Sequence, residues 1–228
     1  MSARHRTAAV LATVCAGTAL SGCLGMGGDP DAGTNGVGKL PATTIEQQAK
    51  DAAAAAPTVR LSGTVLSKGQ TFRLDMRLRG NGGVGEVTTK GGTFQLLRVG
   101  KDLFLKAGAD FYGDGGTDQD SKAAAAKLSD KYVKVPTGDP SYQQLSGFTD
   151  KKVLLADLFV LSGPLSVGGH QKVGTVRTIA VDGAKGGSLD VSLEGKPYPL
   201  RYQRASGAGA LTLTDWGEDF TLAAPDAS

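Results

Sequence analysis

The side chain best placed for chemistry is the thiol of Cys23, which ends the tetrapeptide Leu20-Ser21-Gly22-Cys23. The segment before it begins with two positive charges, Arg4 and Arg6, and continues as a short apolar run over residues 7–20. A positive region, an apolar region and a small-residue cleavage site are the three parts of a secretory signal. We therefore expect residues 1–22 to be removed and the rest of the chain to be exported.

The tetrapeptide resembles a bacterial lipobox, in which the cysteine thiol is diacylglycerylated and the cysteine becomes the new N-terminus. The apolar run is short for a membrane-spanning helix, which needs about 20 residues, and this favours a cleaved signal over an anchor helix. The resemblance implies an extracytoplasmic protein held at the outer face of the cytoplasmic membrane through diacylglyceryl-Cys23.

Few other side chains could support nucleophilic or metal chemistry. The sequence has two cysteines and two histidines, and Cys15 and His5 would leave with the leader. His170 would remain, in a Gly-rich stretch that we expect to be an exposed turn. This inventory excludes most nucleophilic triads and zinc sites, and no G-x-S-x-G or paired-carboxylate signature is present. We expect no catalytic residue, no metal and no cofactor.

Length and charge limit the partners further. The 228 residues carry 25 Lys and Arg against 22 Asp and Glu, and loss of the two leader arginines leaves a net charge of +1. A nucleic-acid partner would need a concentrated basic surface, so we expect none. The 206 residues that follow the leader fit one large domain, which must be held together by its core because no disulfide can form.

Two glycine-rich stretches have functional as well as structural interpretations. Residues 80–85 match the dinucleotide fingerprint G-x-G-x-x-G, but a β-type sequence follows where that motif needs a helix, so a hairpin loop is favoured. Residues 108–121 hold four aspartates, of which Asp114, Asp118 and Asp120 suggest calcium. Their spacing does not match an EF-hand and no closing Glu follows, so we expect an acidic surface loop.

The chain after Cys23 divides into a linker and a domain. Residues 24–39 are Gly-rich and nearly free of large apolar side chains, which is typical of a disordered tether with an r.m.s. span of roughly 20–24 Å. A helix is expected over 44–56, from the capping-box spacing of Thr44 and Gln47. We therefore divide the chain into a signal at 1–22, a lipidated cysteine and tether at 23–40, and a domain at 41–226.

Most of the domain has the two-residue period of β-strands. Apolar residues from Phe72 to Leu78 alternate with Arg73, Asp75 and Arg77, which predicts a half-buried antiparallel strand with a solvated charged face. Further strands are expected near 84–90, 93–99, 103–106 and 132–135, with a four-strand meander after residue 174. About ten strands form a sheet large enough to curl or close.

A helix expected over 150–161 is apolar around almost its whole circumference, which is typical of a buried helix. A short helix is also expected over 123–128. The predicted fold is α+β, with a single strongly curved antiparallel sheet, a half-barrel of about ten strands, wrapped around two or three helices.

The order of these elements behind a lipobox resembles the LppX/LprA/LprF/LprG lipoproteins of actinobacteria, in the LolA/LolB-like superfamily. The similarity rests on Leu61–Val65, Leu103–Leu105, Gly195–Arg201 and Leu213–Gly217, with Ala224-Pro225 at the end. It implies a half-barrel with an apolar cavity that holds acylated lipids and serves lipid carriage across the envelope or envelope biogenesis. The acidic loop and the poly-Ala helix depart from the family.

On that resemblance we expect the lipid cavity to be lined by inward-facing apolar residues of the sheet and of helix 150–161. They are Phe72, Leu74, Met76, Leu78, Phe94, Leu96, Leu103, Leu105, Leu154, Leu158, Leu161, Leu189, Val191 and Leu193. The expected partners are the membrane, an acylated lipid, and an envelope transporter or other membrane protein. The alternative is a non-catalytic sensor or scaffold, whose half-barrel is filled by its own side chains and which binds an envelope protein.

Replacement of the lipobox cysteine tests the anchor. Cys23→Ala removes the thiol that would be acylated, so the protein should leave the membrane fraction or stay uncleaved. Metabolic labelling with an alkyne fatty acid, followed by fractionation, measures both effects. Label retained on the alanine variant would contradict lipidation at Cys23, because the variant lacks the only thiol to which this account attaches a lipid.

Overall fold

The computed structural model describes residues 29–67, 69–80, 82–113 and 119–225. The leader, Cys23 and the middle of the acidic loop, with Asp114 and Asp118, lie outside these residues. From Asp31 onward the chain forms one compact unit. This unit contains every strand and the whole hydrophobic core described below, so we expect it to fold without the leader.

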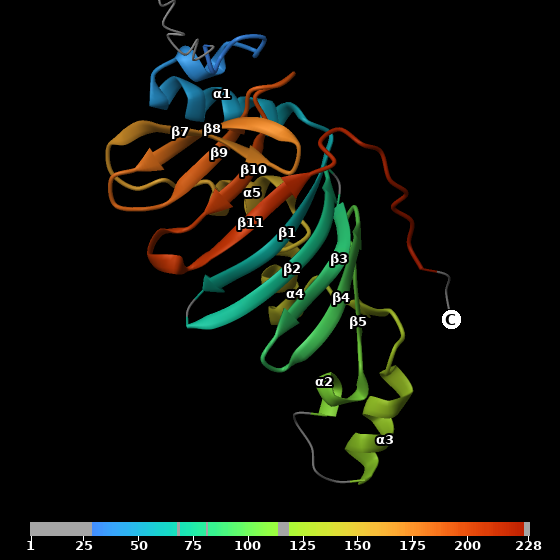
Figure 1. Cartoon of the computed structure of the whole chain (residues 1–228). Helices are drawn as coiled ribbons and strands as arrows, with labels where there is room; N and C mark the ends of the chain where they lie inside the picture. The colour runs from blue at the N-terminus through green and yellow to red at the C-terminus, as the bar shows by residue number, and fades with distance from the viewer. Residues whose placement is uncertain (1–28, 68, 81, 114–118, 226–228) are drawn as a thin grey trace, which may run out of the picture. The chain divides into compact units, whose positions relative to one another are not determined.

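Eleven antiparallel strands form a single open sheet in the order β6-β5-β4-β3-β2-β1-β11-β10-β9-β8-β7 (Figure 1). The first six are Thr58–Ser67, Gln70–Arg79, Gly82–Thr89, Gly92–Val99, Asp102–Ala107 and Val133–Val135. The last five are Leu165–Val173, Val176–Gly183, Ser188–Ser192, Pro199–Gln203 and Gly209–Thr214. The sheet is therefore two meanders, β1–β6 and β7–β11.

The two meanders are joined where β1 pairs with β11, in a register that runs from Arg60 opposite Thr214 to Val65 opposite Gly209. Glycines bring the two backbones close together at this seam. Gly63 has φ 141°, and a Cβ there would lie 2.2 Å from the Ala210 carbonyl oxygen. Gly209 has φ 119°, and its Cβ would lie 2.0 Å from the oxygen of Thr64. Any side chain at either position would force the strands apart.

Five α-helices accompany the sheet in the described part of the chain. They are α1 (Ala42–Ala55), α2 (Ala109–Gly113), α3 (Gln119–Leu128), α4 (Pro140–Gly147) and α5 (Lys151–Leu158). Helix α1 contacts strands β7 to β10, and α2 contacts β4 and β5. Figure 1 shows α4 and α5 behind the strands, on one face of the sheet.

The hydrophobic core lies between that face and the helices. It combines inward-facing residues of the strands with Ile45 and Ala49 of α1 and with Leu154, Leu155 and Phe159 at α5. The alternation in β2 predicted its buried face correctly, because Leu74, Met76 and Leu78 are all buried.

The opposite face of β1 and β2 carries the expected charges. Arg60 pairs with Asp75 at 2.8 Å, and its hydrogen bond holds the pKa of that carboxyl below its usual value. Arg77 lies 3.6 Å from Asp215. These pairs are consistent with a solvated ionic face.

The predicted single antiparallel sheet is confirmed, with two differences in element content. There are eleven strands, and the described residues form five α-helices where two or three were expected. Within the Gly80–Gly85 stretch, Gly80 follows β2 and Gly82 to Gly85 already belong to β3, which pairs with β2, so most of the expected hairpin loop is strand. His170 lies in β7 and contacts Asp31 at 3.0 Å, so the expected turn there was wrong.

The helix expected over 150–161 also differs from its prediction. It ends at Leu158, and it is not buried all round, since Val153 is 48% exposed and Val160, just beyond it, is 58% exposed. The apolar residues of this segment outnumber the positions that face the core. Its outer side is left apolar and accessible.

Residues 31–40, most of which were expected to belong to a disordered tether, are attached to the sheet. The backbone N–H of Asn35 donates to the carbonyl of Leu193 at 2.9 Å, and its side-chain amide donates to the carbonyl of Ser192 at 3.0 Å. Val37 is buried in the core. Backbone hydrogen bonds and one apolar anchor thus attach residues 31–40, despite a glycine-rich composition, to the end of β9.

Candidate functional site

A cavity of about 500 Å³ lies between α1 and α5. Glu46, Lys50, Ala53 and Ala54 line it on α1. The other wall belongs to α5 and the residues that follow it, namely Lys151, Lys152, Leu155, Ala156, Phe159, Val160 and Leu161. Its volume falls within the range of small-molecule sites, about 300–1,000 Å³.

The side chains of α1 explain why this volume is empty. The last turns of α1 are built from alanines, and Ala53 and Ala54 present a single methyl group each to the cavity. The facing wall offers larger groups, such as Leu155 and Phe159. Helices normally fill the space between them by interdigitating side chains, which methyl groups on one side cannot do. An apolar cavity results.

Asp150 fixes the start of α5. Its carboxylate caps the helix by accepting the N–H groups of Lys152 and Val153 at 3.0 and 3.1 Å, and it lies 3.4 Å from the Arg98 guanidinium. Burial alone would raise the pKa of Asp150, but the two N–H donors and Arg98 hold it below its ordinary value. A charged cap at this position sets where the next two side chains, Lys151 and Lys152, emerge.

Lys151 joins the two helices. It is only 4% exposed, and its ammonium donates to the carbonyl oxygens of Ala53 at 3.1 Å, Ala54 at 3.2 Å and Ala56. These carbonyls are at the C-terminus of α1, where the helix leaves acceptors without donors and carries its negative dipole end. One buried cation therefore satisfies the end of α1 and holds it against the beginning of α5.

Aromatic packing holds the segment that follows α5. Phe159 meets Tyr202 edge-on, with ring centroids 6.0 Å apart. The Tyr202 hydroxyl donates to the carbonyl of Val160 at 2.7 Å. This pair attaches the segment after α5 to strand β10 and places apolar rings at the end opposite the lysines.

Most residues predicted to line a lipid cavity are packed in the core instead. Leu161 lines the cavity, whereas eleven others belong to the buried cluster and Phe72 packs against it. The side chain of Leu158 lies outside the described residues. The eleven are Leu74, Met76, Leu78, Phe94, Leu96, Leu103, Leu105, Leu154, Leu189, Val191 and Leu193. Their role as lipid contacts stays a prediction.

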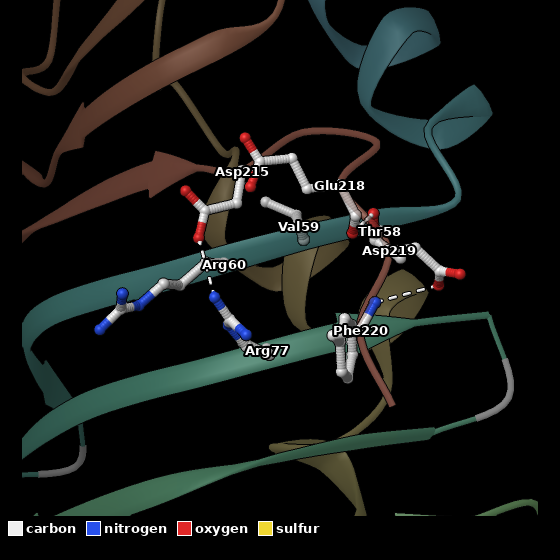
Figure 2. A pocket seen from close by; sticks show the side chains of 8 residues that line it. All are labelled: Thr58, Val59, Arg60, Arg77, Asp215, Glu218, Asp219 and Phe220. Atoms are coloured by element: carbon white, nitrogen blue, oxygen red, sulfur yellow. Dashed lines mark hydrogen bonds and ion pairs between the residues drawn. The ribbon is translucent and has the colours of Figure 1, made fainter. Parts of the chain in front are cut away.

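A second hollow, of about 10 Å³, lies on the outer face of the sheet. Figure 2 shows it between strands β1 and β2 and the segment after β11, with Asp215 directed toward Arg77. The guanidinium carbon of Arg77 lies over the Phe220 ring, 6.0 Å from the ring centroid. This volume is about that of one water molecule, so the larger cavity is the candidate site.

Metal and membrane-spanning features are not part of the described structure. No cluster of three or more His, Cys, Asp or Glu suited to a metal ion occurs among the described residues. Within the same ranges, no helix combines the length and the apolar character needed to cross a bilayer.

Comparison with known proteins bears on the fold. No protein-family model matches the sequence, and the comparison with curated proteins finds no match. The crystal structure of LprF from Mycobacterium bovis matches with a TM-score of 0.56 and 16% identity, over 81% of this chain and 96% of that one. The chain has an LprF-type fold. The LppX structure from Mycobacterium tuberculosis has a TM-score of 0.48 and 17% identity, over 80% of this chain and 98% of that one.

The late segments that carried the resemblance to the LppX/LprF-type fold meet in space. Trp216 follows β11, and its indole N–H donates to the Pro199 carbonyl at 3.0 Å. Its ring stacks on that of Tyr198, with centroids 5.0 Å apart. These contacts attach the C-terminal segment beside β10.

The polar side chains of the site were missed by the sequence argument. No role was assigned to Lys50, Lys151 or Lys152 from the sequence, and the poly-Ala helix was noted only as a departure from the family. One signal was available: an aspartate suited to capping, Asp150, is followed at once by two lysines. The acceptors of Lys151 are backbone carbonyls nearly a hundred residues earlier, and no sequence pattern marks them.

Replacement of Lys151 tests the connection between the helices. Lys151→Met keeps an unbranched side chain one atom shorter but leaves three carbonyls at the end of α1 without their donor, which should lower the free energy of unfolding by about 1–3 kcal/mol. Lys152→Met, at the exposed neighbouring position, should change it by less than about 0.5 kcal/mol. Urea denaturation of both variants measures the difference, and equal stabilities would contradict the role of Lys151.

Comparison of the wild-type protein with Lys151→Met also tests the shifted pKa of Lys151. Burial, with help from the Lys152 charge, lowers the pKa of Lys151 below 10.5. The folded protein then releases this proton at a lower pH than the unfolded chain. Between the two pKa values the unfolded chain binds more protons, so the contribution of Lys151 to the free energy of unfolding increases as the pH rises toward 10.5 and decreases as the pH falls. The stability of wild type relative to Lys151→Met should therefore increase over this window.

Proposed function

We propose that this protein is a membrane-anchored extracytoplasmic lipoprotein that binds an acylated lipid in the cavity between α1 and α5, for lipid carriage or envelope biogenesis. The observation that carries the proposal is an apolar volume of about 500 Å³ that the protein's own side chains leave unfilled. The LprF-type fold and the lipobox resemblance support it.

Desolvation supplies the binding energy in this proposal. Each methylene moved from water into an apolar site contributes about 0.8 kcal/mol, so an acyl chain along Leu155 and Phe159 gains several kcal/mol without any catalytic group. The lipid can leave again when a membrane or a partner offers its chain an equally apolar site. Binding of this kind suits reversible carriage.

The anchor in this proposal is diacylglyceryl-Cys23. Because the compact unit begins at Asp31, seven residues, 24–30, separate Cys23 from the domain. The chain then consists of a signal at 1–22, a lipidated tether at 23–30 and a lipid-binding domain at 31–225.

One observation favours a second function, that of a sensor or scaffold. The sheet face that was expected to enclose a lipid is packed with its own side chains, and Met76 in its middle is 0% exposed. A protein of this kind would use its outer surfaces to bind an envelope protein. The two functions differ in whether the α1–α5 cavity accepts an acyl chain.

Filling the cavity separates the two functions. Ala54 lines the cavity and is exposed, so Ala54→Phe should place a ring where the acyl chain would lie and reduce binding of a fluorescent fatty-acyl probe at least tenfold. Ala55→Phe is the matched control, because Ala55 is equally exposed on α1 but does not line the cavity. Both variants should keep the stability of wild type within about 0.5 kcal/mol.

The titration uses a soluble chain of residues 29–228 that has been unfolded, freed of lipid and refolded. Selective loss of probe binding in Ala54→Phe supports the carrier. Absence of binding to the wild-type chain would reject the carrier and leave the scaffold, and equal binding in all three proteins would place the acyl chain elsewhere.

A further inference from the structure

The charges of the cavity are unequal. Its lining includes three lysines and one glutamate, and that glutamate, Glu46, is paired with Lys50 at 2.8 Å. Two positive charges, on Lys151 and Lys152, remain at the beginning of α5. Lys151 is buried against the α1 carbonyls, whereas Lys152 is exposed at the rim. The cavity therefore has an apolar interior and a cationic mouth.

The charged and apolar lining residues of α5 lie toward opposite ends of this helix. Lys152 lies in its first turn, while Phe159, Val160 and Leu161 lie at and beyond its end. A ligand with its polar group at Lys152 would run along Leu155 and end against Phe159 and Leu161. The reverse orientation would take an anionic headgroup away from Lys152 and place it beside Phe159, Val160 and Leu161, which are apolar.

The volume limits the number of chains. If each chain carbon takes roughly 30 Å³, about the share of a water molecule in the liquid, then the cavity of about 500 Å³ holds roughly 16 carbons. That is one long acyl chain. A second chain of this length would have to lie in solvent or displace the core.

We propose that the ligand is a single-chain amphiphile with an anionic headgroup, such as a long-chain carboxylate or a monoacyl phosphate ester, whose head binds Lys152 and whose chain occupies the α1–α5 cavity. This inference rests on the proposed function and adds the class of lipid. An anion at the mouth also compensates two neighbouring cations that otherwise repel each other, since the charge of Lys152 helps to lower the pKa of Lys151.

Headgroup charge is tested with ligands of equal chain length. Dodecanoate, dodecyl phosphate and the neutral monododecanoylglycerol are titrated below their micelle-forming concentrations against the soluble chain of residues 29–228. We expect both anions to bind about fivefold or more tightly than the neutral ligand, from one close charge pair. The two anions distinguish a carboxylate head from a phosphate head.

Lys152→Gln tests whether Lys152 is the group that binds the anionic headgroup. It should weaken both anions about fivefold, leave the neutral ligand unchanged and remove most of the salt dependence of anion binding. Lys127→Gln, at an exposed lysine of α3 outside the cavity, is the matched control and should change none of these constants.

Chain number and length are tested in the same format. Within a series of saturated carboxylates, affinity should rise about fourfold per added methylene and level off near 16 carbons, where the cavity is full. A two-chain phosphatidic acid should gain nothing over the monoacyl form. Continued gain with a second chain would overturn the single-chain assignment.

The outcomes separate this inference from the function on which it rests. If no amphiphile binds, the carrier function itself fails. If neutral and anionic ligands bind equally, and Lys152→Gln changes neither, then the cavity binds acyl chains but the anionic class is wrong.

Discussion

One buried cation holds together the part of this molecule that matters for function. The ammonium of Lys151 donates to three carbonyls at the C-terminus of α1, so the end of one helix and the beginning of another are fixed at a single point. Alanines on one helix and larger apolar groups on the other leave an empty volume beside that point. Without this contact, the end of α1 would no longer be held against the beginning of α5, and the two walls of the cavity would lose their fixed separation.

The sheet supplies the frame for that contact. Eleven strands bury one face under α1, α4 and α5, and the two meanders meet at a seam where Gly63 and Gly209 let the backbones approach closely. The inward face of the sheet carries a cluster of buried apolar side chains, which includes Ile45 of α1 and Leu154 of α5. The cavity is therefore peripheral to the core.

The sequence predicted the sheet well and the site poorly, for different physical reasons. A half-buried strand has a two-residue period, and the residues that this period assigns to the inner face of β2, Leu74, Met76 and Leu78, are buried in the core. A cavity has no such period. It depends on where small side chains of one helix face a second helix, and the contact that fixes this arrangement uses backbone carbonyls, which every residue possesses.

The remaining differences have similar causes. The segment after Asp150 is apolar around almost its whole circumference, which predicts a buried helix. Val153 and Val160 are nevertheless exposed, because other elements of the fold do not cover that side of the segment. Residues 31–40 read as a tether because glycine dominates them. Asn35 and Val37 nevertheless supply enough specific contacts to attach them to the sheet.

The central claim is that the cavity between α1 and α5 holds an acyl chain in the living cell. Organic extraction and mass spectrometry of the soluble domain, produced in its native host and purified without detergent, test it most directly. The account predicts an acylated compound with one long chain and an anionic head, at close to one molecule per protein and exchangeable for added amphiphile. Recovery of no lipid from folded protein, in repeated preparations that bind no added amphiphile, would contradict it.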